Sequence, residues 1–245
     1  MDINHLSLSC EYQPLIDPQS LAVWGYEALS RFKDSKLQPI PPNLVFERLH
    51  DSPELFAQVE YLAKSFQLAH APSGRLFINI DPHGMQGHWI EPMLALLAPR
   101  PDLTVELIEN TCMNEAQMAI DLIHMLKLRQ ISCALDDIGA PGTMLCFELM
   151  TKMNYLKFDR HWLTKLDDSD NYALLSSLID YGKRTGKLCI LEGIETQQQL
   201  LWAQKLKVDL VQGFLFKPQF INPQQAVSCH KALALAPECL IGSSN

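Results

Sequence analysis

The chain lacks several features that would assign it to a specialised class of protein. Its seven cysteines are scattered and form no CxxC pair, a pattern that indicates neither a disulfide framework nor a zinc site and favours a reducing, cytoplasmic compartment. Residues 1–15 have no basic stretch followed by a long apolar one, so we expect no secretion signal. No run approaches the ~18 apolar residues that span a bilayer, so we expect no membrane association.

An excess of basic residues is also missing. The chain carries 20 Lys and Arg against 28 Asp and Glu, a formal net charge of −8, which argues against long nucleic acid as a partner. The negative net charge does not exclude a small phosphate ligand, because a bound metal reverses the sign of the electrostatic potential locally. With 245 residues, 47% hydrophobic, and no linker or low-complexity segment, we expect one domain over residues 1–245. Its core would span about residues 8–225, followed by a C-terminal helix and a frayed tail.

Short apolar runs typical of strands alternate with segments that have apolar residues at i, i+3 and i+4, the period of a helix. The predicted strands are Ser7–Tyr12, Val23–Leu29, Arg75–Ile80, Leu103–Leu107, Ser132–Leu135, Tyr155–Phe158, Leu188–Leu191 and Asp209–Phe214. The predicted helices are Leu44–Ala69, split near Asp51-Ser52-Pro53, then Glu115–Leu128, Thr143–Met153, Tyr172–Arg184 and Gln197–Leu206.

The connections between the strands predict the fold class. Most are long enough for a helix, which gives right-handed βαβ units and parallel strands. Segment 13–22 is too short for one, so the first two strands should be antiparallel. We therefore expect an α/β fold, a TIM-type (β/α)8 barrel with one antiparallel strand near the N-terminus.

Acidic and amide side chains stand at the ends of these apolar runs. Strands of a parallel sheet covered on both faces are nearly continuous hydrophobic runs, and a carboxylate buried there costs several kcal/mol unless it is paired, hydrogen-bonded or bound to a metal. Alternation puts Lys157 and Asp159 on one face of their strand. If that face looks into the barrel, one mouth collects Glu27, Asn79, Glu106, Asp136, Lys157, Glu192 and Gln212.

Carboxylates packed in this way repel one another, so either some stay protonated or cations lie among them. Ligands that are all oxygen suit Mg²⁺ or Mn²⁺. The adjacent Asp136 and Asp137 can serve two ions about 3.5–4 Å apart, a separation that clamps an in-line phosphoryl displacement. One lysine can neutralise charge that builds on phosphate oxygens. The residues alone predict a metal-dependent hydrolase of a phosphate ester.

The order of these motifs resembles the EAL domain family, the phosphodiesterases of the bacterial second messenger cyclic di-GMP. The resemblance opens with Tyr12-Gln13-Pro14 and Glu27-Ala28-Leu29-Ser30-Arg31 and covers about residues 8–220. It continues through Asn79 in FINID, Glu106 and Glu109 in VELIEN, Asp136-Asp137 in ALDDIG, Lys157 in YLKFD, Glu192 and Glu195 in LEGIET, and Gln212-Gly213-Phe214. It implies a barrel with one reversed strand and hydrolysis of cyclic di-GMP to linear pGpG.

The resemblance also implies roles for individual residues. The implied ligands of one or two Mg²⁺ or Mn²⁺ ions are Glu27, Asn79, Glu106, Asp136, Asp137 and Glu192. The implied catalytic residues are Glu27, Asp137, Lys157 and Glu192, with Lys157 on the attacking water or the phosphate. The implied substrate-binding residues are Gln13, Arg31, Asp159, Glu195 and Gln212, and Glu109 would anchor the loop after the Asp pair. The implied partners are cyclic di-GMP and a second copy of the chain, and a regulatory protein is possible.

The loop after the Asp pair departs from the family pattern DDFGTGYSSL. This chain reads Ile138-Gly139-Ala140-Pro141-Gly142-Thr143-Met144 there, and Pro141 fixes its own φ, removes an N–H and restricts Ala140. Two functions therefore stay open: an active phosphodiesterase, which the intact set of implied ligands favours, and a weak or inactive protein that binds cyclic di-GMP or a partner as a signalling effector. Asp81, where the family more often has Ser, is a smaller departure. His83 and His88 follow it, and we expect them in a solvated or ligand-shaping loop rather than in a metal site.

Overall fold

The computed structural model describes residues 3–108 and 113–234. In chain order its strands and helices are β1 (Ser7–Ile16), β2 (Val23–Lys33), β3 (Pro39–Ile40), α1 (Pro42–Leu49), α2 (Pro53–Ala69), β4 (Arg75–Asn79), α3 (Ile90–Leu97), β5 (Leu103–Ile108), α4 (Met113–Leu128), β6 (Ser132–Ile138), α5 (Phe147–Lys152), β7 (Tyr155–Phe158), α6 (Ser169–Arg184), β8 (Leu188–Leu191), α7 (Gln197–Leu206), β9 (Leu210–Val211) and β10 (Val227–Ser228). Short 3-10 helices include η2 (Pro82–Gly84), η4 (Arg160–Thr164) and η6 (Cys229–Ala234).

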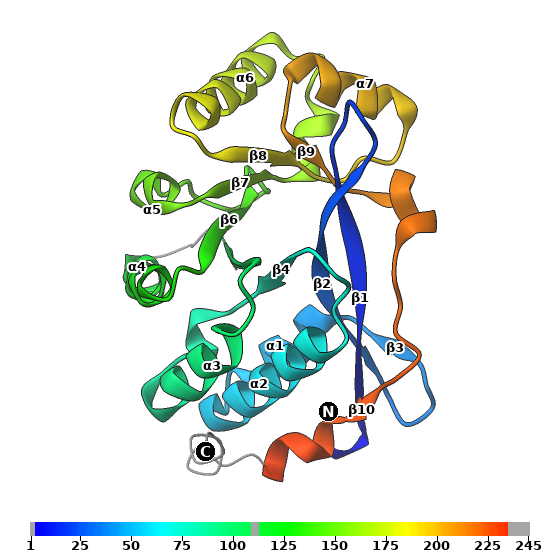
Figure 1. The fold of residues 1–245 in the computed structure, drawn as a ribbon, viewed down its shortest axis with the longest axis vertical. Coiled ribbons are helices and arrows are strands. Elements are labelled where there is room, and N and C mark those ends of the chain that lie inside the picture. The colour runs from blue at the N-terminus through cyan, green and yellow to red at the C-terminus, as the bar shows by residue number, and fades with distance from the viewer. Residues whose placement is uncertain (1–2, 109–112, 235–245) are drawn as a thin grey trace.

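Eight strands close into a ring in the order β1, β2, β4, β5, β6, β7, β8, β9 and back to β1. Strand β1 is antiparallel to both of its neighbours, whereas the pairs from β2 to β9 are parallel. Strands β3 and β10 extend the sheet outside the ring. In Figure 1 β1 and β2 form one long hairpin that runs along most of the length of the molecule. The predicted TIM-type barrel with one reversed N-terminal strand is confirmed.

Some predicted elements differ from the structure. Helix α3 escaped prediction because its eight, mostly apolar residues are fewer than the roughly 11–18 over which a helical period can be recognised. Helix α5 starts at Phe147 rather than at Thr143, because a turn occupies the residues after Pro141. After residue 225, the described chain forms β10, which pairs with Leu8 of β1, and then η6, rather than the expected helix. That pairing needs an edge of β1 which the local sequence does not reveal.

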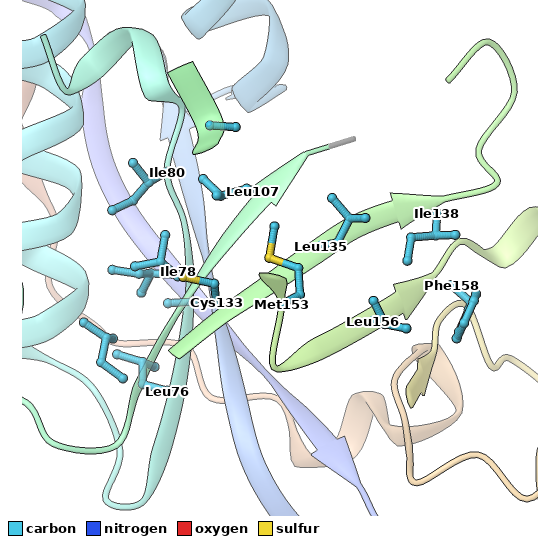
Figure 2. Packing of buried hydrophobic residues seen from close by; sticks show 14 of the residues in the cluster. Leu76, Ile78, Ile80, Leu107, Cys133, Leu135, Ile138, Met153, Leu156 and Phe158 are labelled. Carbon is cyan, nitrogen blue, oxygen red and sulfur yellow. The ribbon is translucent and has the colours of Figure 1, made fainter. Parts of the chain in front are cut away.

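The buried side chains form two layers, one on each side of the barrel wall. Outward-facing residues such as Leu76, Ile78, Leu135 and Leu156 pack under the surrounding helices (Figure 2). A smaller cluster from alternate strand positions fills the inside, and its members are Leu15, Phe77, Ala134, Ile190 and Leu210. Because side chains alternate along a strand, the next inward-facing positions lie two residues away from this plug, at the mouth of the barrel.

No helix among the described residues is both long enough and apolar enough to cross a bilayer.

Candidate metal centre

The alternation of side chains along each strand, which points the plug residues into the barrel, also points polar residues into its mouth. Asn79 lies two residues beyond Phe77, Glu192 two beyond Ile190, and Gln212 two beyond Leu210. All three therefore face inward, one layer above the apolar plug, at the carboxyl ends of their strands. Neighbouring strands align this layer, since Asn79 is paired with Glu106 across β4 and β5 and Gln13 with Glu27 across β1 and β2.

Lys157 lies at the centre of this layer. Its Nζ is 2.7 Å from Glu106 Oε1 and 2.9 Å from both Asp136 Oδ1 and Glu192 Oε1. Glu27 Oε2 is 3.4 Å away. The lysine side chain is 1% exposed and Glu106 is fully buried, so solvent screens these charges little. One ammonium thus faces four carboxylates.

Two amides tie the carboxylates together. Asn79 Nδ2 donates to Glu27 Oε1 at 2.8 Å and to Glu106 Oε2 at 3.1 Å. Gln212 Nε2 donates to the other oxygen of Glu27, Oε2, at 2.7 Å, and contacts Gln13 Oε1 at 3.3 Å. Glu27 is therefore held from both sides and its orientation is fixed before any ligand arrives.

The charge imbalance moves the pKa values of the carboxyl groups. Burial, followed by the nearby Glu27 charge, raises the pKa of Glu106 well above its usual range. Burial also raises the pKa of Glu192 to about 8 and, together with the Asp136 charge, that of Asp137 to about 6. For Glu27 burial acts in the same direction, but the Lys157 ammonium and several hydrogen bonds outweigh it, so its pKa is lowered. Without a further cation, the centre holds extra protons.

The donor set fits divalent metal ions. Glu27, Glu106 and Asp136 each offer an oxygen within 4.8 Å of the others, and Asp136, Asp137 and Glu192 form a second such group. Asp136 belongs to both. Glu106 Oε1 and Asp136 Oδ1 are buried against the Lys157 ammonium, so an ion that binds these oxygens would take over part of that contact. All-oxygen ligands with spare negative charge suit Mg²⁺ or Mn²⁺.

Asp137 owes its position to a break in strand β6. The pairing of β6 with β7 shifts register between Leu135 and Ile138, and Asp137 has a left-handed φ of 58°. Such a bulge re-aims a side chain, and Asp is one of the few residues that tolerate this conformation. The predicted strand ended at Leu135, but the structure continues it through the acidic pair to Ile138.

The loop after Asp137 is held by its own contacts. Trp162 Nε1 donates to Ile138 O at 2.8 Å, and its ring covers Gly139, whose φ is +83°. Ala140 N–H donates to Asp137 O at 2.9 Å, and the Thr143 hydroxyl donates to Ala140 O at 2.9 Å. The altered sequence thus forms a compact turn, and the turn supports Asp137.

The predicted substrate-binding residues lie around the mouth. Gln13, Asp159, Glu195 and Gln212 line a cavity of about 290 Å³ whose floor includes Asp136, Asp137, Lys157 and Glu192. Asp159 also accepts the His161 backbone N–H at 2.7 Å, which begins η4. Arg31 lines an adjoining cavity that reaches Glu27 and Asn79.

Glu11 is a residue of the site that the sequence analysis did not predict. Its Oε1 accepts from Arg31 Nη2 at 2.6 Å and from Gln13 Nε2 at 2.9 Å, so it orients two predicted substrate-binding residues. The alternation of side chains could have revealed it, since Glu11 and Gln13 are two residues apart and share a face of β1. Glu109, the predicted loop anchor, lies outside the described residues.

Comparisons with known proteins found similar sequences and similar folds. A family model described as "EAL domain" matches residues 2–219. The chain is 26% identical over 216 residues to the probable cyclic di-GMP phosphodiesterase PdeN of Escherichia coli K12, a match that covers 83% of this chain. It spans 42% of the length of PdeN.

Solved structures share the fold. The PaMucR phosphodiesterase in its c-di-GMP complex superposes with a TM-score of 0.69 at 19% identity, over 91% of this chain and 93% of that one. BlrP1 of Klebsiella pneumoniae, in a manganese and cyclic di-GMP complex, gives a TM-score of 0.70 at 20% identity, over 85% of this chain and 55% of that one.

Proposed function

The chain belongs to the EAL domain family, and on that premise we propose that it hydrolyses one phosphodiester bond of cyclic di-GMP, with divalent metal ions, to give linear pGpG. The observation that carries this proposal is the contact of four carboxylates from separate strands with the single ammonium of Lys157. An arrangement that costs so much electrostatic energy is expected where cations bind. PdeN, named a probable cyclic di-GMP phosphodiesterase, supports the choice of substrate.

Mg²⁺ or Mn²⁺ is the proposed cofactor. Glu27, Asn79, Glu106 and Asp136 would hold one ion, and Asp136, Asp137 and Glu192 the other. Asn79 would turn its amide oxygen to the ion, because the amide nitrogen that now donates to Glu27 cannot bind a cation. When bound, such ions make water more acidic and neutralise charge on phosphate oxygens.

Side chains at the mouth would position the phosphate and the attacking water. Lys157, released from part of its carboxylate shell, would face the attacked phosphate and stabilise the charge that develops there. Glu192 is a candidate acceptor for the proton of the attacking water, since it lines the mouth and its Oε1 lies 2.9 Å from Lys157 Nζ. Arg31, oriented by Glu11, would contact a phosphate oxygen of the dinucleotide.

Turnover of purified protein tests this function. Cyclic di-GMP would be incubated with protein and Mg²⁺ or Mn²⁺, and the products separated by chromatography. We expect pGpG from the wild type and none from Glu27→Ala, which removes a shared ligand. Glu148→Ala, which changes an exposed glutamate on α5, is a matched control and should keep full activity. If the wild type forms no pGpG in Mg²⁺ and none in Mn²⁺, the proposed catalysis is refuted.

A second function, a cyclic di-GMP effector without turnover, is favoured by one feature, the Pro141-containing loop. The contacts that hold Asp137 in place count against it, because they keep both acidic residues at the mouth. Tight binding of cyclic di-GMP with no product in either metal would support the effector.

A further inference from the structure

A second cluster of metal-ligating side chains lies outside the acidic centre. His50 is the C-cap of α1, and Asp81 and His83 belong to the loop that follows β4. Asp81 Oδ1 is 2.8 Å from His83 Nδ1, and Asp81 Oδ2 is 3.6 Å from His50 Nε2. One potential ligand atom from each of the three lies within 4.8 Å of the other two. The cluster joins residues 33 positions apart in sequence (83 − 50), so it is a product of the fold.

The packing around the cluster fixes its geometry. The centroid of the His50 ring lies 4.8 Å from that of the Phe56 ring. The His83 ring packs edge-on against the His50 ring, with 5.3 Å between their centroids. Asp81 accepts the backbone N–H of His83 at 2.8 Å, so it caps the start of η2, and its own N–H points at Glu60 Oε1, 3.4 Å away. Each side chain is thus oriented by a neighbour before any ligand binds, which lowers the entropy cost of binding one.

Solvent reaches the cluster. The side chains of His50, Asp81 and His83 are 43%, 32% and 40% exposed. Three ligands on an open surface leave room for water at the remaining coordination positions. This arrangement differs from the acidic centre, which has no imidazole.

We propose that His50, Asp81 and His83 bind one divalent cation of the borderline class, with Zn²⁺ as the best fit. Two imidazole nitrogens and one carboxylate oxygen suit Zn²⁺, Co²⁺ or Ni²⁺, whereas imidazole nitrogens are poor ligands for Mg²⁺. Ligands at the usual Zn distance of about 2.0–2.1 Å in a tetrahedron lie roughly 3.3 Å apart. The Asp81 carboxylate lies between the two rings, with Oδ1 2.8 Å from His83 Nδ1 and Oδ2 3.6 Å from His50 Nε2, so side-chain rotations would bring one oxygen and both nitrogens around a single ion. The proposal departs from the sequence analysis, which expected His83 in a solvated or ligand-shaping loop and found no zinc site in the cysteine pattern; no cysteine takes part here.

The site adjoins the acidic centre without sharing its ligands. Asp81 lines the same cavity as Glu27, Asn79 and Asp136. Asn79 ends β4 two residues before it, and the intervening Ile80 N–H donates to Glu106 O at 3.1 Å. A cation there would tie the end of α1 to the loop that forms this wall of the mouth. We therefore expect binding to raise thermal stability.

Co²⁺ offers a spectroscopic test in untagged protein. Co²⁺ would be titrated in the presence of excess Mg²⁺, which competes at the oxygen sites and not for imidazole, and followed by its visible absorption; Zn²⁺ would then be added to displace it. We expect one equivalent to bind in the wild type. His83→Ala and Asp81→Asn should weaken binding at least about tenfold. Asp81→Asn keeps an oxygen that can cap η2, so its loss of binding would report the ligand charge rather than misfolding.

His88→Ala is the matched control, because His88 lies in the same loop region but pairs with Glu54, at 3.1 Å. It should bind Co²⁺ like the wild type. Glu27→Ala should also retain the signal, so this site is tested independently of the phosphodiesterase activity. Equal Co²⁺ affinity in the wild type, His83→Ala and Asp81→Asn, or no imidazole-type spectrum in the wild type, would overturn the proposal.

Discussion

Lys157 Nζ lies 2.7 Å from Glu106 Oε1, deep in the mouth of the barrel, and neither side chain is exposed by more than 1%. This pair joins β7 to β5 across the interior, with the Asp136 strand between them. Three further carboxylates approach the same ammonium. Its charge is therefore needed for stability in the metal-free protein and, under the proposed function, for stabilising the phosphate during turnover.

Replacing Lys157 by Met should separate these two roles. Without the ammonium, the buried carboxylates lose their only charged partner among the described residues, which we expect to cost about 3–5 kcal/mol of unfolding free energy in chelator. Mg²⁺ should restore part of that stability, whereas turnover of cyclic di-GMP should stay at least ~100-fold below wild type. Urea denaturation with and without Mg²⁺, beside a product assay, measures both.

Lys152→Met is the control for this experiment, because Lys152 makes only an exposed i,i+4 pair with Glu148. It should leave stability and turnover nearly unchanged. Normal turnover in Lys157→Met would contradict the assigned role.

Bound metal should counteract the pH dependence of stability. Glu192 and Asp137 have pKa values raised to about 8 and about 6, so the folded protein holds their protons more tightly than the unfolded chain does. A raised acid pKa adds stability at low pH, and that stability is lost as pH rises from the unfolded value toward about 8. Glu27, whose lowered pKa has the opposite sign, offsets part of the loss only below the normal glutamate pKa.

Melting temperatures in chelator should therefore fall between about pH 6 and about pH 8. Bound metal favours the ionised carboxylates, so the rise in melting temperature on adding Mg²⁺ should be larger at the higher pH. An equal rise at both pH values would mean that these two carboxyl groups are not linked to metal binding.

Gly139 should tolerate no side chain. Its φ is +83°, and an added Cβ would lie 2.4 Å from Trp162 Nε1, whose N–H donates to Ile138 O. Gly139→Ala should therefore displace Trp162 and with it Asp137, which would lower turnover sharply and destabilise the protein by about 2 kcal/mol or more.

Gly142→Ala separates steric from conformational cost in the same loop. Gly142 has a similar φ of +87°, but nothing lies within 4 Å of its added Cβ. Only the backbone cost of about 1 kcal/mol should appear, with turnover largely kept. Equal effects of the two substitutions on turnover would show that contact with Trp162 does not hold Asp137.

Replacing Mg²⁺ by Ca²⁺ should separate the binding of cyclic di-GMP from its hydrolysis. Ca²⁺ prefers about 6–8 oxygen ligands at longer distances and in looser geometry than Mg²⁺. We expect Ca²⁺ to support binding of cyclic di-GMP, measured by calorimetry, while pGpG formation stops. Removal of all divalent ions by chelator should abolish turnover, and Mg²⁺ or Mn²⁺ should restore it. Full turnover in Ca²⁺ alone would contradict the proposed ligand geometry.

Much of this molecule could be read from local sequence patterns. Strands Tyr155–Phe158 and Leu188–Leu191 and helix Gln197–Leu206 have the predicted bounds, because turn signals flank each of them. Helix α3 was missed, because its eight residues are too few to show a period, and β10 was missed, because two residues form a strand only where another edge pairs with them.

The sequence by itself determined which residues share a face of each strand, because side chains alternate whatever the surroundings. That periodicity set Asn79, Glu106, Lys157 and Glu192 above an apolar plug, and the short first connection required a reversed strand. Only the tertiary structure decided how these faces meet. Closure of the ring brings four carboxylates onto one ammonium, the bulge in β6 turns Asp137 toward the mouth, and the end of α1 carries His50 to Asp81 and His83. These are distances between segments far apart in the chain, and packing of the whole barrel sets them.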